Sequence, residues 1–312
     1  MKTNKILITT SSFGKDDASI LDDLRGAGYE VVLNPYKRKL TEAEVSQLLS
    51  EVRPVGIIAG VEPLTGAVIG KAEGLKVISR CGIGLDNVDL SAAKRLGIPV
   101  LSTPDAPTLA VAELTVALML NVLRGIPAMD GAVRAGRWDR PMGRLLSGKT
   151  VGLIGCGRIG SSVARLISGF RCETLGYDPK IRSHPSIRLT DLDSLLRNSD
   201  IISVHVPYSK ETHHLINADN IRDLKKGAVL INTSRGGIVD EAALCAALRE
   251  GTIGGAGIDC FLQEPYCGEL AGCEQAVLTC HVGSYAKESR IQMEREAAEN
   301  LLRALKDAGG MK

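Results

Sequence analysis

The stretch Val151–Gly160, VGLIGCGRIG, decides the fold. An apolar run leads into three glycines spaced GxGxxG, and a helix-period segment follows. In this pattern Gly155 permits a tight turn, Gly157 lets the backbone approach a pyrophosphate, and Gly160 lets the helix pack on the strand. The phosphates would lie at the helix N-terminus, where backbone N–H groups are unpaired and the helix dipole is positive. The stretch therefore predicts the strand, turn and helix of a dinucleotide-binding domain.

An acidic residue ends the next expected strand, residues 174–178. Asp178 follows Gly160 by 18 residues. A carboxylate there can accept hydrogen bonds from both ribose hydroxyls of NAD, and it would repel the 2′-phosphate of NADP. Pro179 and Lys180 come next, so no Arg stands beside the carboxylate to bind that phosphate. We predict NAD as the cofactor. The alternative is a structural glycine turn that binds no nucleotide, and the strand, helix and acidic residue together argue against it.

Short apolar runs alternate with helix-period segments on both sides of this stretch. Such alternation predicts two α/β domains, each a doubly wound, Rossmann-like parallel sheet. The long segment 109–123 is apolar nearly all round, so we place it between domains or at a subunit contact. Residues 125–146 are expected to form a looser arm that carries four Arg and Trp138. The expected strands are 5–10, 29–33, 56–60, 76–80, 99–103, 150–155, 174–178, 201–206, 228–233, 255–259 and 276–280, with helices at 16–25, 42–51 and 287–305.

The composition excludes several classes of protein. The 312 residues are 44% hydrophobic and 24% charged, with a net charge of +2. This balance favours a globular protein and gives no strong attraction to nucleic acid or membranes. No signal peptide or membrane span is indicated, so we expect a soluble cytoplasmic protein. With three Phe, one Trp and 34 Gly, the core must consist of Val, Ile, Leu and Ala, as in buried parallel sheets.

The eight cysteines fit a reducing compartment. Cys267 and Cys273 lie in a Gly-rich loop with no credible zinc spacing, so no metal is predicted, and a redox switch between these two thiols is an open alternative. The other six are expected to be small buried thiols: Cys81, Cys156, Cys172, Cys245, Cys260 and Cys280.

Three later segments each place one chemical group near the carboxyl end of an expected strand, where ligands bind in open α/β sheets. They are 231–237 (INTSRGG), 259–265 (DCFLQEP) and 278–284 (LTCHVGS). Arg235 could bind the carboxylate and carbonyl oxygen of a 2-oxo acid, since its planar fork suits both. His281 could give and take the proton, and Glu264 could orient it and favour the imidazolium.

Each of these residues also has a plain structural interpretation. Arg235 could form a surface ion pair, Glu264 could be a loop carboxylate, and His281 could be a structural histidine. Only the three together, beside a dinucleotide site, favour catalysis. His205 also follows a strand, and we interpret it as lining the cofactor groove. The remaining histidines, His184, His213 and His214, lie in polar loops and receive no role.

Taken together, these motifs resemble those of the D-2-hydroxyacid dehydrogenases, and within them the phosphoglycerate dehydrogenase branch, in its short form without a regulatory domain. The likeness runs through nearly the whole chain. It includes SRCGIGLDNVDL at 79–90, VAELT at 111–115, GRWDR at 136–140, the glycine motif, HVP at 205–207, NTSRGG at 232–237, GAGID at 255–259, EP at 264–265 and HVGS at 281–284.

The resemblance implies a substrate-binding, flavodoxin-like domain of residues 1–103 plus 285–312, with an NAD-binding domain of residues 104–284 inserted into it and the active site in the cleft. It also implies a homodimer held by the cofactor domains, with the 125–146 arm reaching across. Serine feedback is not expected on this chain.

The resemblance also assigns roles residue by residue. Arg235 would bind the substrate, Glu264 would pair with the histidine, and His281 would be the acid–base. The backbone of Gly60 and Val61 would hold the substrate carboxylate. Beyond the three glycines, the cofactor contacts would be Arg158 and Ile159 at the pyrophosphate, Asp178 at the ribose, Asp259 at the nicotinamide carboxamide, and Val206, Pro207, Thr212, Thr233 and Gly283 along the groove.

Two departures from the family pattern concern the substrate. The loop Ala59–Glu62 has no Lys or Arg, and Pro107 stands where an Asn is common. A phosphate would then need a cation from Arg80, Arg134, Arg137 or Arg140. We predict hydride transfer at C2 of 3-phosphoglycerate and its oxo product. The alternatives are glyoxylate, hydroxypyruvate or a hydroxy acid of specialised metabolism, and, in another class, an NAD-sensing corepressor of the same fold.

Overall fold

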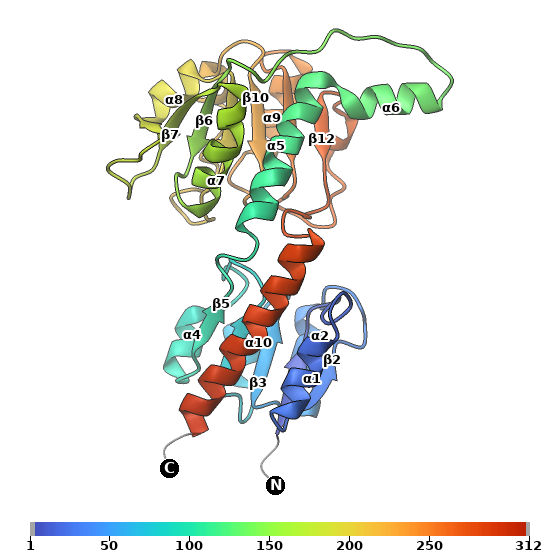
Figure 1. Ribbon diagram of the computed structural model, residues 1–312, viewed down its shortest axis with the longest axis vertical. Coiled ribbons are helices and arrows are strands. Elements are labelled where there is room, and N and C mark those ends of the chain that lie inside the picture. Colours follow the sequence, from blue (N-terminus) through green and yellow to red (C-terminus); the bar gives the residue numbers. More distant parts are fainter. Residues whose placement is uncertain (1–3, 310–312) are drawn as a thin grey trace. The chain divides into compact units, whose positions relative to one another are not determined.

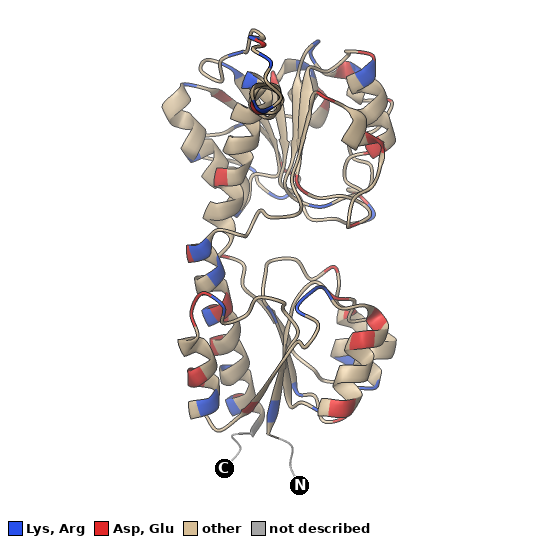
Figure 2. Cartoon of the chain, turned by 90° about the vertical axis from the view of Figure 1, so that its right-hand side faces the viewer, with Lys and Arg blue, Asp and Glu red and all other residues tan. Residues whose placement is uncertain are grey.

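A computed structural model describes residues 4–309, and contacts divide the chain into two compact units (Figure 1). One unit is Met1–Pro107 with Ser284–Lys312, and the other is Thr108–Gly283. Each is built on one parallel sheet with helices on both faces, so the predicted α/β class is confirmed. In Figure 2 the charged residues lie mostly on helices and loops, while the strands are largely uncharged.

The first unit has five parallel strands in the order β2-β1-β3-β4-β5. Helices α1 and α10 pack on one face, and α2, α3 and α4 pack on the other. Ile6 and Ile58 face one layer, whereas Leu7 and Ile57 face the other, and all four are fully buried. The elements are β1 (Lys5–Ile8), α1 (Ser19–Gly26), β2 (Glu30–Leu33), α2 (Glu42–Val52), β3 (Gly56–Ala59), α3 (Gly66–Gly70), β4 (Val77–Arg80), α4 (Leu90–Arg95), β5 (Val100–Ser102) and α10 (Lys287–Gly309).

The second unit has seven strands in the order β12-β11-β10-β9-β6-β7-β8, all parallel. Helices α5 and α7 cover one face, and α8 and α9 cover the other. The elements are α5 (Thr108–Arg124), α6 (Ile126–Arg134), β6 (Thr150–Ile154), α7 (Arg158–Ile167), β7 (Glu173–Tyr177), β8 (Arg188–Leu189), α8 (Leu192–Asn198), β9 (Ile201–Val204), β10 (Val229–Asn232), α9 (Glu241–Arg249), β11 (Gly255–Ile258) and β12 (Ala276–Leu278).

The structure corrects some of the expected local structure. The first part of the arm expected to be loose is the nine-residue helix α6, which Gly125, at φ 59°, separates from α5. The long apolar helix α5 packs on α7, β10 and β11 inside its own unit, which explains its lack of a polar face. Among residues 4–309 no single helix is long and apolar enough to cross a membrane; α5 and α6 pass that test only as a pair, bent by 63°.

The cysteines also differ from expectation. Cys280 is exposed and Cys172 is partly exposed, whereas Cys273, expected in a loop, is buried. The Sγ atom of Cys273 lies 3.3 Å from that of Cys245 on α9. The thiol next to Cys273 is therefore Cys245, whereas the sequence alone suggested Cys267. Burial, together with the Cys273 thiol, raises the pKa of Cys245 to about 11, which keeps it a thiol at neutral pH. No cluster able to bind a metal ion occurs within the described residues.

Candidate active site

The glycine motif forms a turn between β6 and α7 that only glycine can make. Gly155 has φ 97°, and a Cβ there would lie 2.5 Å from the carbonyl oxygen of His205. A Cβ on Gly160 would lie 2.1 Å from the carbonyl oxygen of Gly155. Gly157 is the N-cap of α7, has open space around it and offers no side-chain cap. The helix N-terminus is therefore open to an anionic group, as pyrophosphate binding requires.

Asp178 lies at the end of β7, beside this turn. Its Oδ2 accepts a hydrogen bond from the Cys156 N–H at 3.0 Å, and its Oδ1 accepts one from the Lys180 N–H at 2.9 Å. The two bonds fix the carboxylate next to the glycines and leave each oxygen a further lone pair. This geometry fits the ribose of a dinucleotide whose pyrophosphate lies on α7.

Asp178→Ala is expected to relax the preference for NAD over NADP. Removing a charged hydrogen-bond acceptor should lower the ratio of kcat/KM values for the two cofactors by about tenfold or more. Steady-state kinetics with both cofactors measure the ratio. Asp219→Ala, at an exposed aspartate of another loop, is the control. An unchanged ratio in Asp178→Ala would mean that the ribose is recognised elsewhere.

The predicted groove residues follow β9 and β10. His205 packs under the glycine turn, and its Nε2 lies 2.9 Å from Ser203 Oγ. Burial lowers the pKa of His205 to about 3, so its ring is neutral at neutral pH. Thr212 Oγ1 donates to the Pro207 carbonyl and holds the loop that contains Val206. Thr115 donates to a carbonyl of its own helix, so Thr233, at the end of β10, donates to Thr115 at 2.8 Å.

The turn after β10 carries Arg235 and is held by Asn232. The Asn232 side chain accepts from the Ser234 N–H at 3.1 Å and donates to the Arg235 carbonyl at 2.9 Å. A Cβ on Gly236 would lie 2.0 Å from the carbonyl carbon of Phe261, so this turn packs directly on the one after β11. Asn232 and Gly236 were not assigned these roles from the sequence, although an Asn in a polar segment after a strand is a local signal for a turn in which its side chain bonds to the backbone two residues later.

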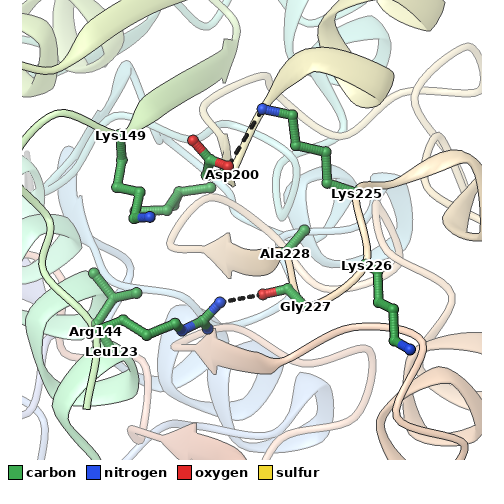
Figure 3. Close-up of a pocket in the computed structure, with 9 residues that line it drawn as sticks. Leu123, Arg144, Lys149, Asp200, Lys225, Lys226, Gly227 and Ala228 are labelled. Atoms are coloured by element: carbon green, nitrogen blue, oxygen red, sulfur yellow. Dashed lines mark hydrogen bonds and ion pairs between the residues drawn. The ribbon is translucent and has the colours of Figure 1, made fainter.

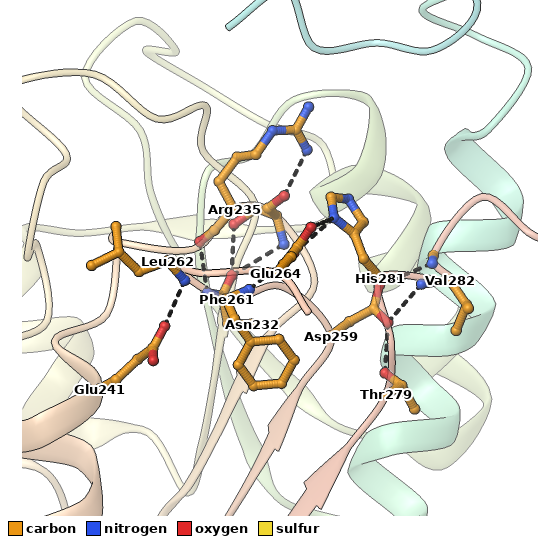
Figure 4. A network of polar contacts seen from close by, with 12 residues as sticks. Asn232, Arg235, Glu241, Asp259, Phe261, Leu262, Glu264, Thr279, His281 and Val282 are labelled. Carbon is orange, nitrogen blue, oxygen red and sulfur yellow. Dashed lines mark hydrogen bonds and ion pairs between the residues drawn. The ribbon is translucent and has the colours of Figure 1, made fainter. Parts of the chain in front are cut away.

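Glu264 and His281 come together at the same edge of the sheet (Figure 4). His281 Nδ1 lies 2.9 Å and 3.0 Å from the two carboxylate oxygens of Glu264, whose Oε1 also accepts from the Phe261 N–H at 3.2 Å. An ionised carboxylate only accepts, so Nδ1 carries the proton and Nε2 is left for chemistry. The His281 side chain is 35% exposed, which leaves the ring open to a ligand.

Asp259 holds the loop on which His281 sits. Its side chain is fully buried, and its carboxylate accepts from Thr279 Oγ1 at 2.6 Å and from the N–H groups of Val282 and Gly283 at 2.9 Å each. His281 adopts a left-handed φ of 55°, which these bonds help to hold. The contacts expected of Asp259 and Gly283 with the cofactor remain predictions, since the groups involved are bonded to each other here.

The expected carboxylate-binding residues, Gly60 and Val61, follow β3 in the other unit. The Gly60 N–H donates to Glu62 Oε1 at 3.0 Å and to Thr9 Oγ1 at 3.1 Å, so it is already paired. Glu62 is 1% exposed, and its carboxylate also accepts from Thr9. Asn87 donates to the carbonyls of Glu62 at 2.7 Å and Gly60 at 3.2 Å. The backbone donors left on this turn are the N–H groups of Val61 and Glu62, which have no partner within residues 4–309.

Comparisons with known proteins agree with this geometry. The family model for the D-isomer specific 2-hydroxyacid dehydrogenase, NAD binding domain, matches residues 116–283. The chain is 44% identical over 258 residues to a glyoxylate reductase of Thermofilum pendens, covering 78% of this chain and 76% of that protein. It is 35% identical over 294 residues to a D-3-phosphoglycerate dehydrogenase of Archaeoglobus fulgidus, covering 92% of this chain and 55% of that protein.

A solved structure is similar to this chain over nearly its whole length. A D-lactate dehydrogenase from Aquifex aeolicus, complexed with NAD and lactic acid, matches with a TM-score of 0.84 at 30% identity, covering 97% of this chain and 96% of that one. The chain is thus an NAD-dependent oxidoreductase of the doubly wound α/β class. It belongs to the D-isomer specific 2-hydroxyacid dehydrogenases, and the predicted family and cofactor are confirmed.

Proposed function

We propose that His281, Glu264 and Arg235 carry out the proton transfer and substrate binding of the dehydrogenase. The observation that supports this is the bond between His281 Nδ1 and Glu264, which leaves Nε2 as the proton donor. NAD, when bound, supplies or accepts the hydride at C2. In reduction, protonated His281 gives its proton to the carbonyl oxygen while Arg235 binds the carboxylate and that oxygen; in oxidation, neutral His281 takes the proton back.

Glu264→Gln tests the pairing. The neutral amide stabilises the imidazolium less than the carboxylate does, so the histidine loses its proton at lower pH. The basic limb of the pH profile for 2-oxo acid reduction is expected to move to lower pH by about one unit. The measurement is kcat/KM against pH for wild type and variant. A profile that stays in place would contradict the pairing, whatever the change in rate.

For the substrate we propose a small unphosphorylated 2-oxo acid of the glyoxylate or hydroxypyruvate type. The support comes from the Ala59–Glu62 turn, where the buried Glu62 carboxylate pairs with the Gly60 N–H and no basic residue is present. A carboxylate at this turn disfavours a substrate that carries a further phosphate dianion.

The phosphorylated substrate expected from the sequence is the second candidate, because Arg80 pairs in register with Ala59, the last residue of β3. The Arg80 side chain is a cation, but the residue is 6% exposed and its Nη1 donates to the Cys81 carbonyl. Reaching a phosphate would therefore require Arg80 to give up that bond, which makes this candidate the weaker one.

Oxidation of NADH, followed at 340 nm with glyoxylate, hydroxypyruvate and 3-phosphohydroxypyruvate, decides between them. A higher kcat/KM for the unphosphorylated acids supports the first proposal. A preference for 3-phosphohydroxypyruvate that falls in Arg80→Gln would replace it with the second. NAD binding without turnover of any of the three acids would contradict both substrates and favour a sensor.

We also propose that the protein is a cytoplasmic homodimer formed through the NAD-binding unit. The support is a set of apolar side chains on α6 and the segment after it, of which Trp138 is 80%, Met142 97% and Leu145 69% exposed. Monomeric proteins rarely expose so many apolar side chains together, and a second copy of the chain would cover them. A molar mass near 33 kDa by light scattering, the mass of one chain, would contradict the dimer.

A further inference from the structure

The NAD-binding unit contains a polar pocket at the edge of its sheet opposite the candidate active site. The pocket has a volume of about 180 Å³ and lies where β6, β9 and β10 begin, whereas the dinucleotide and catalytic residues follow the strand ends. It is lined by Leu123, Arg144, Lys149, Asp200, Ile201, Lys225, Lys226, Gly227 and Ala228 (Figure 3). The lining thus contains four basic side chains and one carboxylate.

That carboxylate neutralises only part of the charge. Asp200 accepts from the Thr150 N–H at 2.9 Å and from Lys225 Nζ at 3.3 Å. Burial raises the pKa of Asp200, but the Thr150 N–H and the positive charges of Lys225 and Lys149 outweigh it, and the net pKa is lowered. Asp200 is therefore ionised, and the pocket keeps a net charge of three positive units at neutral pH.

The acidic side chains next to the pocket form ion pairs with arginines outside it. The Glu173 N–H donates to the Lys149 carbonyl, which places Glu173 close to the pocket. Its carboxylate, however, pairs with Arg188 at 2.6 Å. Asp223, just before the Lys225–Lys226 pair, bonds with Arg197 at 3.3 Å. No hydrogen-bond or ion-pair partner of Lys149 Nζ or Lys226 Nζ is found in the described part of the chain.

Backbone groups hold Arg144 in the pocket lining. Arg144 donates from Nη1 to the Gly227 carbonyl and is tied by its own N–H to the Leu123 carbonyl at 2.9 Å. A Cβ on Gly254 would lie 2.9 Å from Arg144 Nη2, so the absence of a side chain there makes room for the guanidinium. Figure 3 shows Lys149 and Lys225 on either side of Asp200, with Arg144 reaching the Gly227 turn.

We propose that this pocket binds a phosphate group, either as a free inorganic ion or as the phosphate of a small metabolite. A compact site with several ammonium groups and a guanidinium suits a multiply charged oxyanion better than a single carboxylate. The site is separate from the dinucleotide pyrophosphate, which belongs to the other edge of the sheet, so the proposal does not depend on the substrate assigned above.

The test measures anion binding to the full chain saturated with NAD, so that the cofactor site is filled. Calorimetric titrations use inorganic phosphate, pyrophosphate and glycerol 3-phosphate as probes. Binding near one ion per chain, weakened by added salt, is expected. Tighter binding of the inorganic ions would identify a free-ion site, and tighter binding of glycerol 3-phosphate would identify a metabolite site.

Variants locate the binding. Lys149→Gln/Lys226→Gln is expected to weaken it by about tenfold or more, since each lysine contributes a charged contact. Lys71→Gln/Lys94→Gln removes the same charge at exposed lysines of the other unit and should leave the affinity unchanged. Asp200→Asn removes the only carboxylate and should tighten binding. The proposal is overturned if none of the probes binds, or if both lysine pairs change the affinity equally.

Discussion

His281→Ala is expected to lower kcat for 2-oxo acid reduction by about a hundredfold or more, the usual contribution of a general acid–base. The carbonyl oxygen would then have to take its proton from water. Because His281 is bonded to Glu264 and not to the glycine turn, the affinity for NAD should stay close to that of wild type. Steady-state kinetics at saturating substrate give kcat, and fluorescence titration with NADH gives the affinity for the cofactor.

Because the backbone of His281 is left-handed, a second variant is needed beside His281→Ala. Its φ of 55° is unfavourable for alanine, so a loss of activity in His281→Ala could come from a distorted loop. Asparagine adopts this conformation more readily but cannot act as the acid–base, so His281→Asn should lose as much activity while keeping the loop. His213→Ala, at an exposed histidine, is the control. Near wild-type turnover in His281→Asn would remove His281 from the mechanism.

Most of the fold could be predicted because its signals are local. Runs such as 56–60 and 150–155 are apolar on both faces, as strands buried inside a parallel sheet require, and β3 and β6 lie within them. The strand β8 has two residues at the sheet edge and gives no such signal. Helix α6 was missed because several of its apolar residues, including Ile126 and Val133, are exposed instead of facing a core.

The sequence predicted which residues lie at the candidate site, but it did not predict the hydrogen bonds that their side chains make. The rule that ligands bind at the carboxyl ends of parallel strands brought Arg235, Glu264 and His281 to one edge, and the last two lie in contact. No sequence rule shows that the Glu62 carboxylate pairs with the Gly60 N–H, or that Asp259 is fully enclosed by the loop it holds. These facts depend on side-chain conformations and on which backbone groups are left unpaired after folding.

Arg235→Ala is expected to lower kcat/KM for the 2-oxo acid by about a hundredfold or more, because two charge-assisted hydrogen bonds to the substrate are lost. The turn itself should persist, since Asn232 holds it through the Arg235 backbone and Gly236 packs it on Phe261. The affinity for NAD should therefore change little. Initial rates over a range of substrate concentrations, with NADH saturating, give the measurement.

Arg235→Lys separates charge from geometry. Lysine keeps the positive charge but lacks the planar fork that binds a carboxylate with two parallel bonds, so it should restore only a minor part of the lost kcat/KM. Arg222→Ala, at an exposed arginine away from this turn, controls for the change in net charge and should behave as wild type. If Arg235→Lys were fully active, the side chain would act as a simple positive charge, and the proposed two-bond contact with the substrate would be wrong.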